Sequence, residues 1–208
     1  MILGRPLLIS AVLALAISLY SGNAIADDAE DFIRSAGEKA FTSLSKGVTE
    51  EKRADRFREI LLDTFDLRVI ARFTLGRYWR VASKKQRDDY VELFEDYIVQ
   101  AYLHRLGDLS GHTFQIKRSQ EINARDRLVL SEIKAKKSKP PLHVKSKPPI
   151  RINWRVRKNE NTYRVIDVVV EGVSMSVTQR DEFAAVIRRN GGNIDGLLSA
   201  LKRKTGNN

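Results

Sequence analysis

Residues 150–157 read Ile-Arg-Ile-Asn-Trp-Arg-Val-Arg. Apolar and polar side chains alternate throughout, which predicts a half-buried strand with one apolar face and one cationic face. Residues 158–161, Lys-Asn-Glu-Asn, are typical of a turn, and the very apolar run 162–171 follows them. The two runs therefore predict an antiparallel hairpin.

Upstream of this hairpin the sequence keeps a period of two as far back as Gly111. Phe114 and Ile116 mark one strand, and the apolar run 128–131 marks another, with its inner face left undecided between two registers. We therefore predict a sheet of about four antiparallel strands.

The segment 134–149 joins the second and third of these strands and contains a duplication. Lys-Ser-Lys-Pro-Pro at 137–141 recurs at 145–149. Proline donates no backbone hydrogen bond, so this segment belongs in an exposed loop or on a sheet edge. Its six lysines favour contact with an anionic membrane surface.

Helical periodicity dominates the rest of the chain. The clearest helix runs from Ser83 to about Leu106, because Ser83 and Gln86 have capping-box spacing and the following apolar residues share one face. Ser176 and Gln179 repeat that spacing. The predicted helices are 28–46, 49–65, 66–75, 83–106, 176–189 and one from Asn193 onward.

These elements predict an α+β fold in which N-terminal helices pack on a curved antiparallel sheet closed by two short C-terminal helices. The helices carry many large apolar side chains on the faces that must meet the sheet. Two interiors fit this pattern: a filled core, or an apolar cavity on the concave side of the sheet that receives apolar ligand tails.

The first 26 residues resemble a secretory signal. Arg5 is their only charge, residues 7–19 are apolar, and Ala24-Ile25-Ala26 supplies small residues for cleavage. A retained anchor is the alternative, but these 13 apolar residues fall short of the roughly 20 that span a bilayer. We therefore expect cleavage and export, which leaves a single domain over residues 27–208.

The composition excludes several classes of protein. The 208 residues contain no cysteine, which rules out a disulfide scaffold, a cysteine-ligated zinc module and a thiol enzyme. The formal charge of +11 is typical of proteins with anionic partners. An exported chain rarely meets nucleic acid, so the expected partner is an anionic lipid surface or an acidic protein, unless the basic surface is merely solvated.

The sequence also lacks recognisable catalytic motifs. There is no G-x-S-x-G elbow, P-loop, G-x-G-x-x-G or H-E-x-x-H, and the three histidines are not paired at i,i+4. Asp167 and Glu171 lie about 13 Å apart on an extended strand, beyond the roughly 6.5–9.5 Å of paired hydrolytic carboxylates. They are better explained by ion pairs with arginines such as Arg151 and Arg155. We predict a protein that is not an enzyme and has no metal and no cofactor.

Two ordered signatures resemble the MlaC family, also called the toluene-tolerance or ABC-transporter auxiliary family. The first is Phe-Asp at 65–66 with Ile-Ala-Arg-Phe-Thr-Leu-Gly-Arg-Tyr-Trp-Arg at 70–80. The second is Tyr-Arg-Val-Ile-Asp-Val-Val-Val-Glu-Gly-Val-Ser at 163–174. Scattered matches extend both signatures at Gln86, Phe94, Tyr97, Arg180, Glu182, Phe183, Ile187, Gly196, Leu197, Leu198 and Leu201.

The resemblance implies a non-enzymatic periplasmic carrier that holds a phospholipid by its acyl chains. Such a carrier shuttles between an outer-membrane lipoprotein complex and an inner-membrane ABC transporter with its substrate-binding subunit. Some relatives are associated with hopanoids, which keeps a hopanoid-type lipid open as the cargo. Gln179 replaces a tyrosine of many members, and the duplicated segment resembles an insertion.

Inward-facing positions of the predicted elements are the candidates for contact with lipid tails, with plain core packing as the alternative for each. Arg77 and Arg80 flank the aromatic pair between them and are candidates for a phosphate at the mouth. The tail candidates are Phe65, Ile70, Phe73, Tyr78, Trp79, Phe94, Tyr97, Ile98, Trp154, Ile166, Val168, Val170 and Val173. Two other functions remain open: a basic envelope-surface adaptor with a filled core, and an unrecognised periplasmic hydrolase.

Overall fold

A computed structural model describes residues 27–206, except for 45–48, 107–110, 137–147 and 161. The expected signal segment and most of the duplicated lysine–proline segment therefore lie outside the described residues. Within the described part, no helix is both long enough and apolar enough to cross a membrane.

The N-terminal half is helical, as predicted. It consists of α1 (Asp28–Ser43), α2 (Glu50–Thr64), α3 (Leu67–Leu75), the single turn α4 (Tyr78–Val81) and α5 (Lys84–Leu106). The capping box before α5 is confirmed: the Gln86 amide donates to Ser83 Oγ at 3.1 Å, and the Ser83 amide donates to Gln86 Oε1 at 3.0 Å. The sequence did not predict α4.

The second half forms one antiparallel sheet in the order β1-β2-β3-β4-β5. Its strands are β1 (His112–Glu121), β2 (Asp126–Ala135), β3 (Ile150–Lys158), β4 (Tyr163–Val170) and the short β5 (Val173–Ser174). Two helices close the chain, α6 (Met175–Arg189) and α7 (Ile194–Thr205). The predicted α+β class is confirmed, with β5 as an additional two-residue strand.

The predicted start of α6 is wrong by two residues. Ser174, not Ser176, caps the helix, and its Oγ accepts a hydrogen bond from the Val177 amide at 3.1 Å. The Ser174 hydroxyl also donates to Asp167 at 2.7 Å. This contact with Asp167 on β4 favours Ser174 as the cap. A rule based on the spacing of neighbouring residues could not predict it, because Asp167 belongs to the preceding strand.

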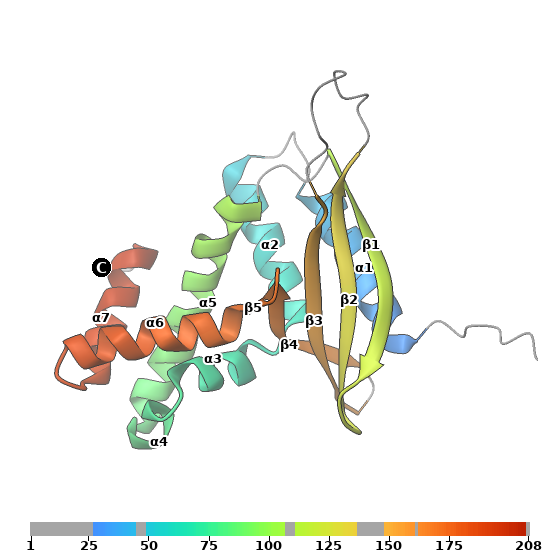
Figure 1. Ribbon diagram of the computed structural model, residues 1–208. Coiled ribbons are helices and arrows are strands. Elements are labelled where there is room, and N and C mark those ends of the chain that lie inside the picture. Colours follow the sequence, from blue (N-terminus) through green and yellow to red (C-terminus); the bar gives the residue numbers. More distant parts are fainter. Residues whose placement is uncertain (1–26, 45–48, 107–110, 137–147, 161, 207–208) are drawn as a thin grey trace, which may run out of the picture.

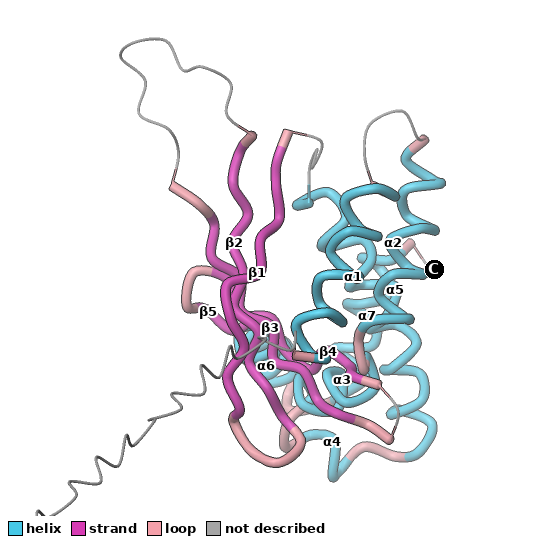
Figure 2. Tube along the Cα trace, turned by 90° about the vertical axis from the view of Figure 1, so that its right-hand side faces the viewer, coloured by secondary structure: helices cyan, strands magenta, loops and turns pink. Residues whose placement is uncertain are grey.

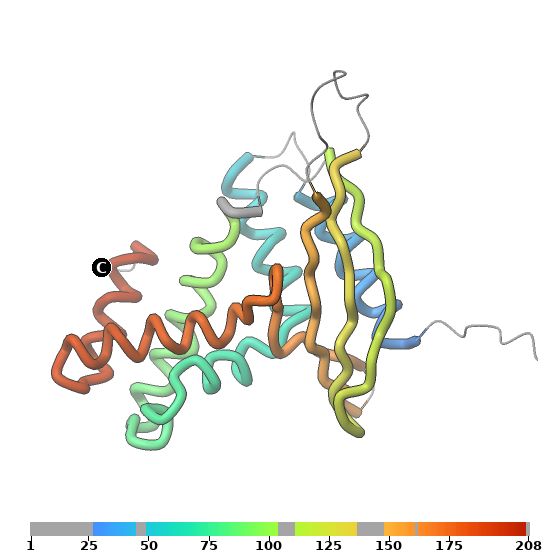
Figure 3. The backbone as a smooth tube through the Cα atoms, viewed as in Figure 1, coloured from blue at the N-terminus to red at the C-terminus, as the bar shows by residue number. Residues whose placement is uncertain are grey.

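The apolar side chains form two separate cores. One lies within the helical layer and joins α2, α3, α5, α6 and α7. The other joins α1 to the sheet and contains Ile33, Val129, Val156 and Val165. Phe65, at the junction of α2 and α3, packs against both cores. Figure 2 shows α1, α2 and α5 together on one side of the sheet, and Figures 1 and 3 show α7 at the far edge of the helical layer.

One buried ion cluster stabilises the hairpin side of the sheet. Asp126 is almost fully buried and accepts hydrogen bonds from Arg157 at 2.7 and 2.9 Å and from Arg155 at 2.8 Å. The Arg157 guanidinium, followed by that of Arg155, holds the pKa of the Asp126 carboxyl well below its ordinary value, although burial acts in the opposite direction. Asp126 is therefore charged in the folded protein, and its ion pairs with Arg155 and Arg157 join β2 to β3.

Candidate functional site: an apolar pocket between sheet and helices

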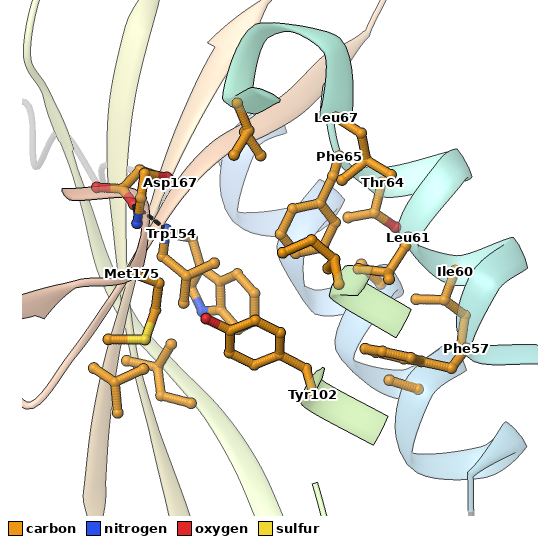
Figure 4. A pocket seen from close by; sticks show the side chains of 18 of the residues that line it. Phe57, Ile60, Leu61, Thr64, Phe65, Leu67, Tyr102, Trp154, Asp167 and Met175 are labelled. Carbon is orange, nitrogen blue, oxygen red and sulfur yellow. Dashed lines mark hydrogen bonds between the residues drawn. The ribbon is translucent and has the colours of Figure 1, made fainter. Parts of the chain in front are cut away.

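A pocket of about 280 Å³ lies between the two cores, where α1, α2, α3 and α5 face β3 and β4 (Figure 4). Most of the lining side chains are apolar. The lining consists of Ile33, Ala36, Gly37, Ala40, Leu44, Phe57, Ile60, Leu61, Thr64, Phe65, Leu67, Ile70, Thr74, Phe94, Ile98, Tyr102, Ile152, Trp154, Asp167, Val168, Val170, Met175, Ser176 and Gln179.

The periodicity of each element explains how it contributes to the wall. On α5, Phe94, Ile98 and Tyr102 are four residues apart and occupy one face. On β4, Val168 and Val170 lie two residues apart and face the pocket, whereas Val169 between them is not part of the lining. Figure 4 shows Trp154 and Tyr102 extending into the same space from the sheet and the helical layer.

Small residues give α1 its place in this wall. Ala36, Gly37 and Ala40 all border the pocket. A Cβ atom on Gly37 would lie only 2.5 Å from a ring carbon of Phe114 on β1. The glycine therefore allows α1 to approach the sheet closely at the pocket edge.

Trp154 forms a fixed aromatic part of the sheet wall. Its indole Nε1 donates to Ser131 Oγ at 2.8 Å, and Ser131 Oγ donates to the Ile152 carbonyl at 2.9 Å. Its ring also meets Phe114 edge to face, with 6.3 Å between centroids. With its polar atom satisfied inside the sheet, the indole presents apolar surface to the pocket.

Asp167 contributes the one carboxylate among the described lining residues, which include no lysine or arginine. Its Oδ1 accepts from the amides of Val168 and Ser176, at 2.9 and 3.1 Å, and its Oδ2 accepts from the Ser174 hydroxyl at 2.7 Å. These bonds tie β4 to the first turn of α6, where the helix dipole favours a negative charge. The Asp167 carboxylate therefore has a structural role, because its hydrogen bonds hold β4 against the start of α6.

Seven of the tail candidates lie in this lining, and the strand alternation and helix faces used in the sequence analysis explain their position. They are Phe65, Ile70, Phe94, Ile98, Trp154, Val168 and Val170. Sequence reasoning missed the whole α1 and α2 wall. The available signal was the helical spacing of Ala36, Gly37 and Ala40, whose small side chains leave space.

The other six candidates lie away from the pocket, for identifiable reasons. Tyr78, Trp79 and Tyr97 pack in or against the helical core. Phe73 is 43% exposed beneath the Arg180 guanidinium, and Val173 is 52% exposed at the start of β5. The register shift between β3 and β4 leaves Ile166 outside the strand pairing.

The charged candidates also differ from expectation. Arg77 and Arg80 do not border the pocket but line a second hollow with Arg188. Glu171 pairs with Arg151 at 3.0 Å, as the sequence suggested, whereas Arg155 pairs with Asp126 rather than Asp167.

Comparison with known proteins places this arrangement in a family. The model of the MlaC protein family matches residues 35–203. The chain belongs to the MlaC family.

Two known proteins are similar to this chain. The intermembrane phospholipid transport system binding protein MlaC of Haemophilus influenzae is 23% identical over 178 residues, covering 82% of this chain and 79% of its own length. A phospholipid-binding protein from Ralstonia solanacearum, solved in complex with a phospholipid at 1.53 Å, superposes with a TM-score of 0.72. That match covers 87% of this chain and 98% of the other, at 19% identity, and shows that the two share a fold.

Proposed function

We propose that this MlaC family member is a periplasmic carrier that encloses the acyl chains of a phospholipid in the pocket between sheet and helices. The carrier moves the lipid between an outer-membrane lipoprotein complex and an inner-membrane ABC transporter with its substrate-binding subunit. The observation that carries the proposal is the pocket itself, which has a largely apolar wall and lies between the two cores.

The energetics explain why such a pocket is needed. Burying one methylene is worth about 0.8 kcal/mol, so a phospholipid with roughly 30 methylenes resists transfer to water by about 24 kcal/mol. A wall of Phe57, Phe94 and Trp154 replaces the membrane interior for the methylenes that enter the pocket. Handover to a site of similar polarity then requires little free energy from the carrier.

The pocket also indicates how the lipid is oriented. Since the described lining offers no cation, a phosphate gains nothing by entering, and we infer that the headgroup stays outside. The proposal contains no catalytic step. Asp167 is the one carboxylate among the described lining residues, and its oxygens already accept three hydrogen bonds that hold β4 and α6 together.

The test is organic extraction and mass spectrometry of the protein purified from the periplasmic fraction of an expressing bacterium. We expect about one lipid per chain, with headgroups in the proportions of the membrane, and a mature chain that begins at Asp27. Detection of a hopanoid-type lipid in place of a phospholipid would change the proposed cargo but would still support a lipid carrier. A chain that contains no lipid and takes up none from vesicles would contradict the proposal and favour the adaptor.

A further inference from the structure

A second hollow, of about 520 Å³, lies at the end of the helical layer. It is built by α4 and the residue before it, by the last turn of α6 and by the turn between α6 and α7, which Figure 1 shows at the end of the molecule away from the sheet. None of its residues lines the apolar pocket. Its lining consists of Arg77, Tyr78, Arg80, Val81, Arg188 and Gly192. We call this surface the arginine hollow.

The charge of the arginine hollow is uncompensated. In the part of the chain that the structure describes, Arg77, Arg80 and Arg188 make no ion pair with a carboxylate, and all three are exposed. Arg77 is oriented by Tyr78: it donates to the tyrosine hydroxyl at 3.1 Å, and its guanidinium lies 5.0 Å from the ring centroid. Guanidinium groups bind phosphate oxygens in a bidentate manner, so three of them around one hollow form a receptor for phosphate groups.

Arg87 holds the backbone of α4 in place beneath these cations. Its Nε donates to the Trp79 carbonyl at 2.8 Å, its Nη2 donates to the Arg80 carbonyl at 3.3 Å, and its guanidinium lies 5.6 Å from the Trp79 ring. Ala82 is buried in the helical core directly after α4. The position of Arg80 and Val81 is therefore fixed by anchors on both sides.

Val81 is 75% exposed, the largest exposed fraction among the described large apolar residues. An apolar side chain that projects beside clustered cations is typical of surfaces that bind the membrane interface. Valine gains from burial among lipid acyl chains while the neighbouring arginines reach the phosphate layer. A carboxylate-rich protein would satisfy the arginines but not the valine.

We propose that the arginine hollow, with Val81 at its rim, binds the phosphate groups of an anionic phospholipid bilayer and docks the protein on the membrane surface. The proposal goes beyond lipid carriage, because it concerns a surface that shares no residue with the pocket. Its success or failure is independent of which lipid the pocket holds.

The test is co-sedimentation of the protein purified from the periplasmic fraction with vesicles of phosphatidylcholine, with or without phosphatidylglycerol. Each arginine near an anionic surface contributes about fivefold to partitioning, so Arg80→Gln with Arg188→Gln should weaken binding to the anionic vesicles by about 25-fold. Val81→Ser should weaken it as well, and added salt should reduce wild-type binding.

The matched control is Arg118→Gln with Arg125→Gln, which removes the same charge from exposed positions on β1 and the turn after it. We expect this variant to keep wild-type binding to within about twofold. Equal losses in the two double variants, or none in either, would overturn the proposal. Tighter binding of the hollow to a polyglutamate peptide than to vesicles would also overturn it, by assigning the surface to an acidic protein.

Two measurements separate this result from the fate of the cargo site. Circular dichroism of each variant shows whether the fold is retained, and lipid extraction shows whether the pocket still carries lipid. A folded, lipid-loaded double variant that no longer sediments with anionic vesicles is the expected outcome.

Discussion

Replacing Val168 by tryptophan tests the pocket directly. Val168 lies on β4 opposite Trp154 of β3, and both side chains face the pocket. Tryptophan exceeds valine by roughly 90 Å³ of side-chain volume, which is about a third of the 280 Å³ pocket. That volume displaces about three methylenes of a bound chain, at about 0.8 kcal/mol each. The loss of about 2.4 kcal/mol should weaken lipid binding by about 50-fold.

The assay measures lipid per mole of purified protein by extraction and mass spectrometry, together with displacement of a fluorescent lipid. The matched control is Val169→Trp, since Val169 belongs to the same strand but lies outside the pocket lining. Thermal unfolding monitors the fold of both variants. A folded Val168→Trp protein with wild-type lipid content would refute the reasoning, as would an equal loss in Val169→Trp.

The sequence predicted those helices and strands whose pattern or cap is formed by residues that are neighbours in the chain. The alternation at 150–157 became β3 because its apolar face packs against α1 and the pocket, and the capping box at Ser83 begins α5 as expected. The start of α6 was not predictable in this way. Capping-box spacing favours Ser176, but Asp167 on β4 accepts hydrogen bonds from the Ser174 hydroxyl and the Ser176 amide, and Ser174 caps the helix.

The candidate site was predictable only where one face of an element is plainly apolar. Val168 and Val170 followed from alternation, but the register shift removed Ile166, and this shift depends on the pairing with β3. Phe73 belongs to an apolar helix face by sequence, yet Arg180 from α6 covers its ring at 5.0 Å and leaves it at the surface. The α1 wall was missed because Gly37 and its alanine neighbours carry no large apolar side chain, so only the helical spacing of these small residues marks their face.

Two further predictions concern the sheet that supports the pocket. Gly37→Ala should lower the free energy of unfolding by about 1 kcal/mol, because the clash with Phe114 outweighs the gain of about 1 kcal/mol in helix propensity. Chemical denaturation checks this against Gly111→Ala, where nothing lies within 4 Å, and a stabilised Gly37→Ala would contradict the packing argument. Asp126→Asn should lower stability at neutral pH by about 2 kcal/mol, since it breaks a buried ion cluster. The depressed pKa of Asp126 stabilises the fold above the ordinary aspartate pKa of about 4, and this contribution declines as the pH falls below that value. The gap between wild type and Asp126→Asn in urea unfolding should therefore narrow by about 1 kcal/mol between pH 6 and about pH 3, because only the wild type takes up a proton at residue 126 on unfolding. A gap that stays constant over this range would show that the Arg157 contact does not favour the charged aspartate.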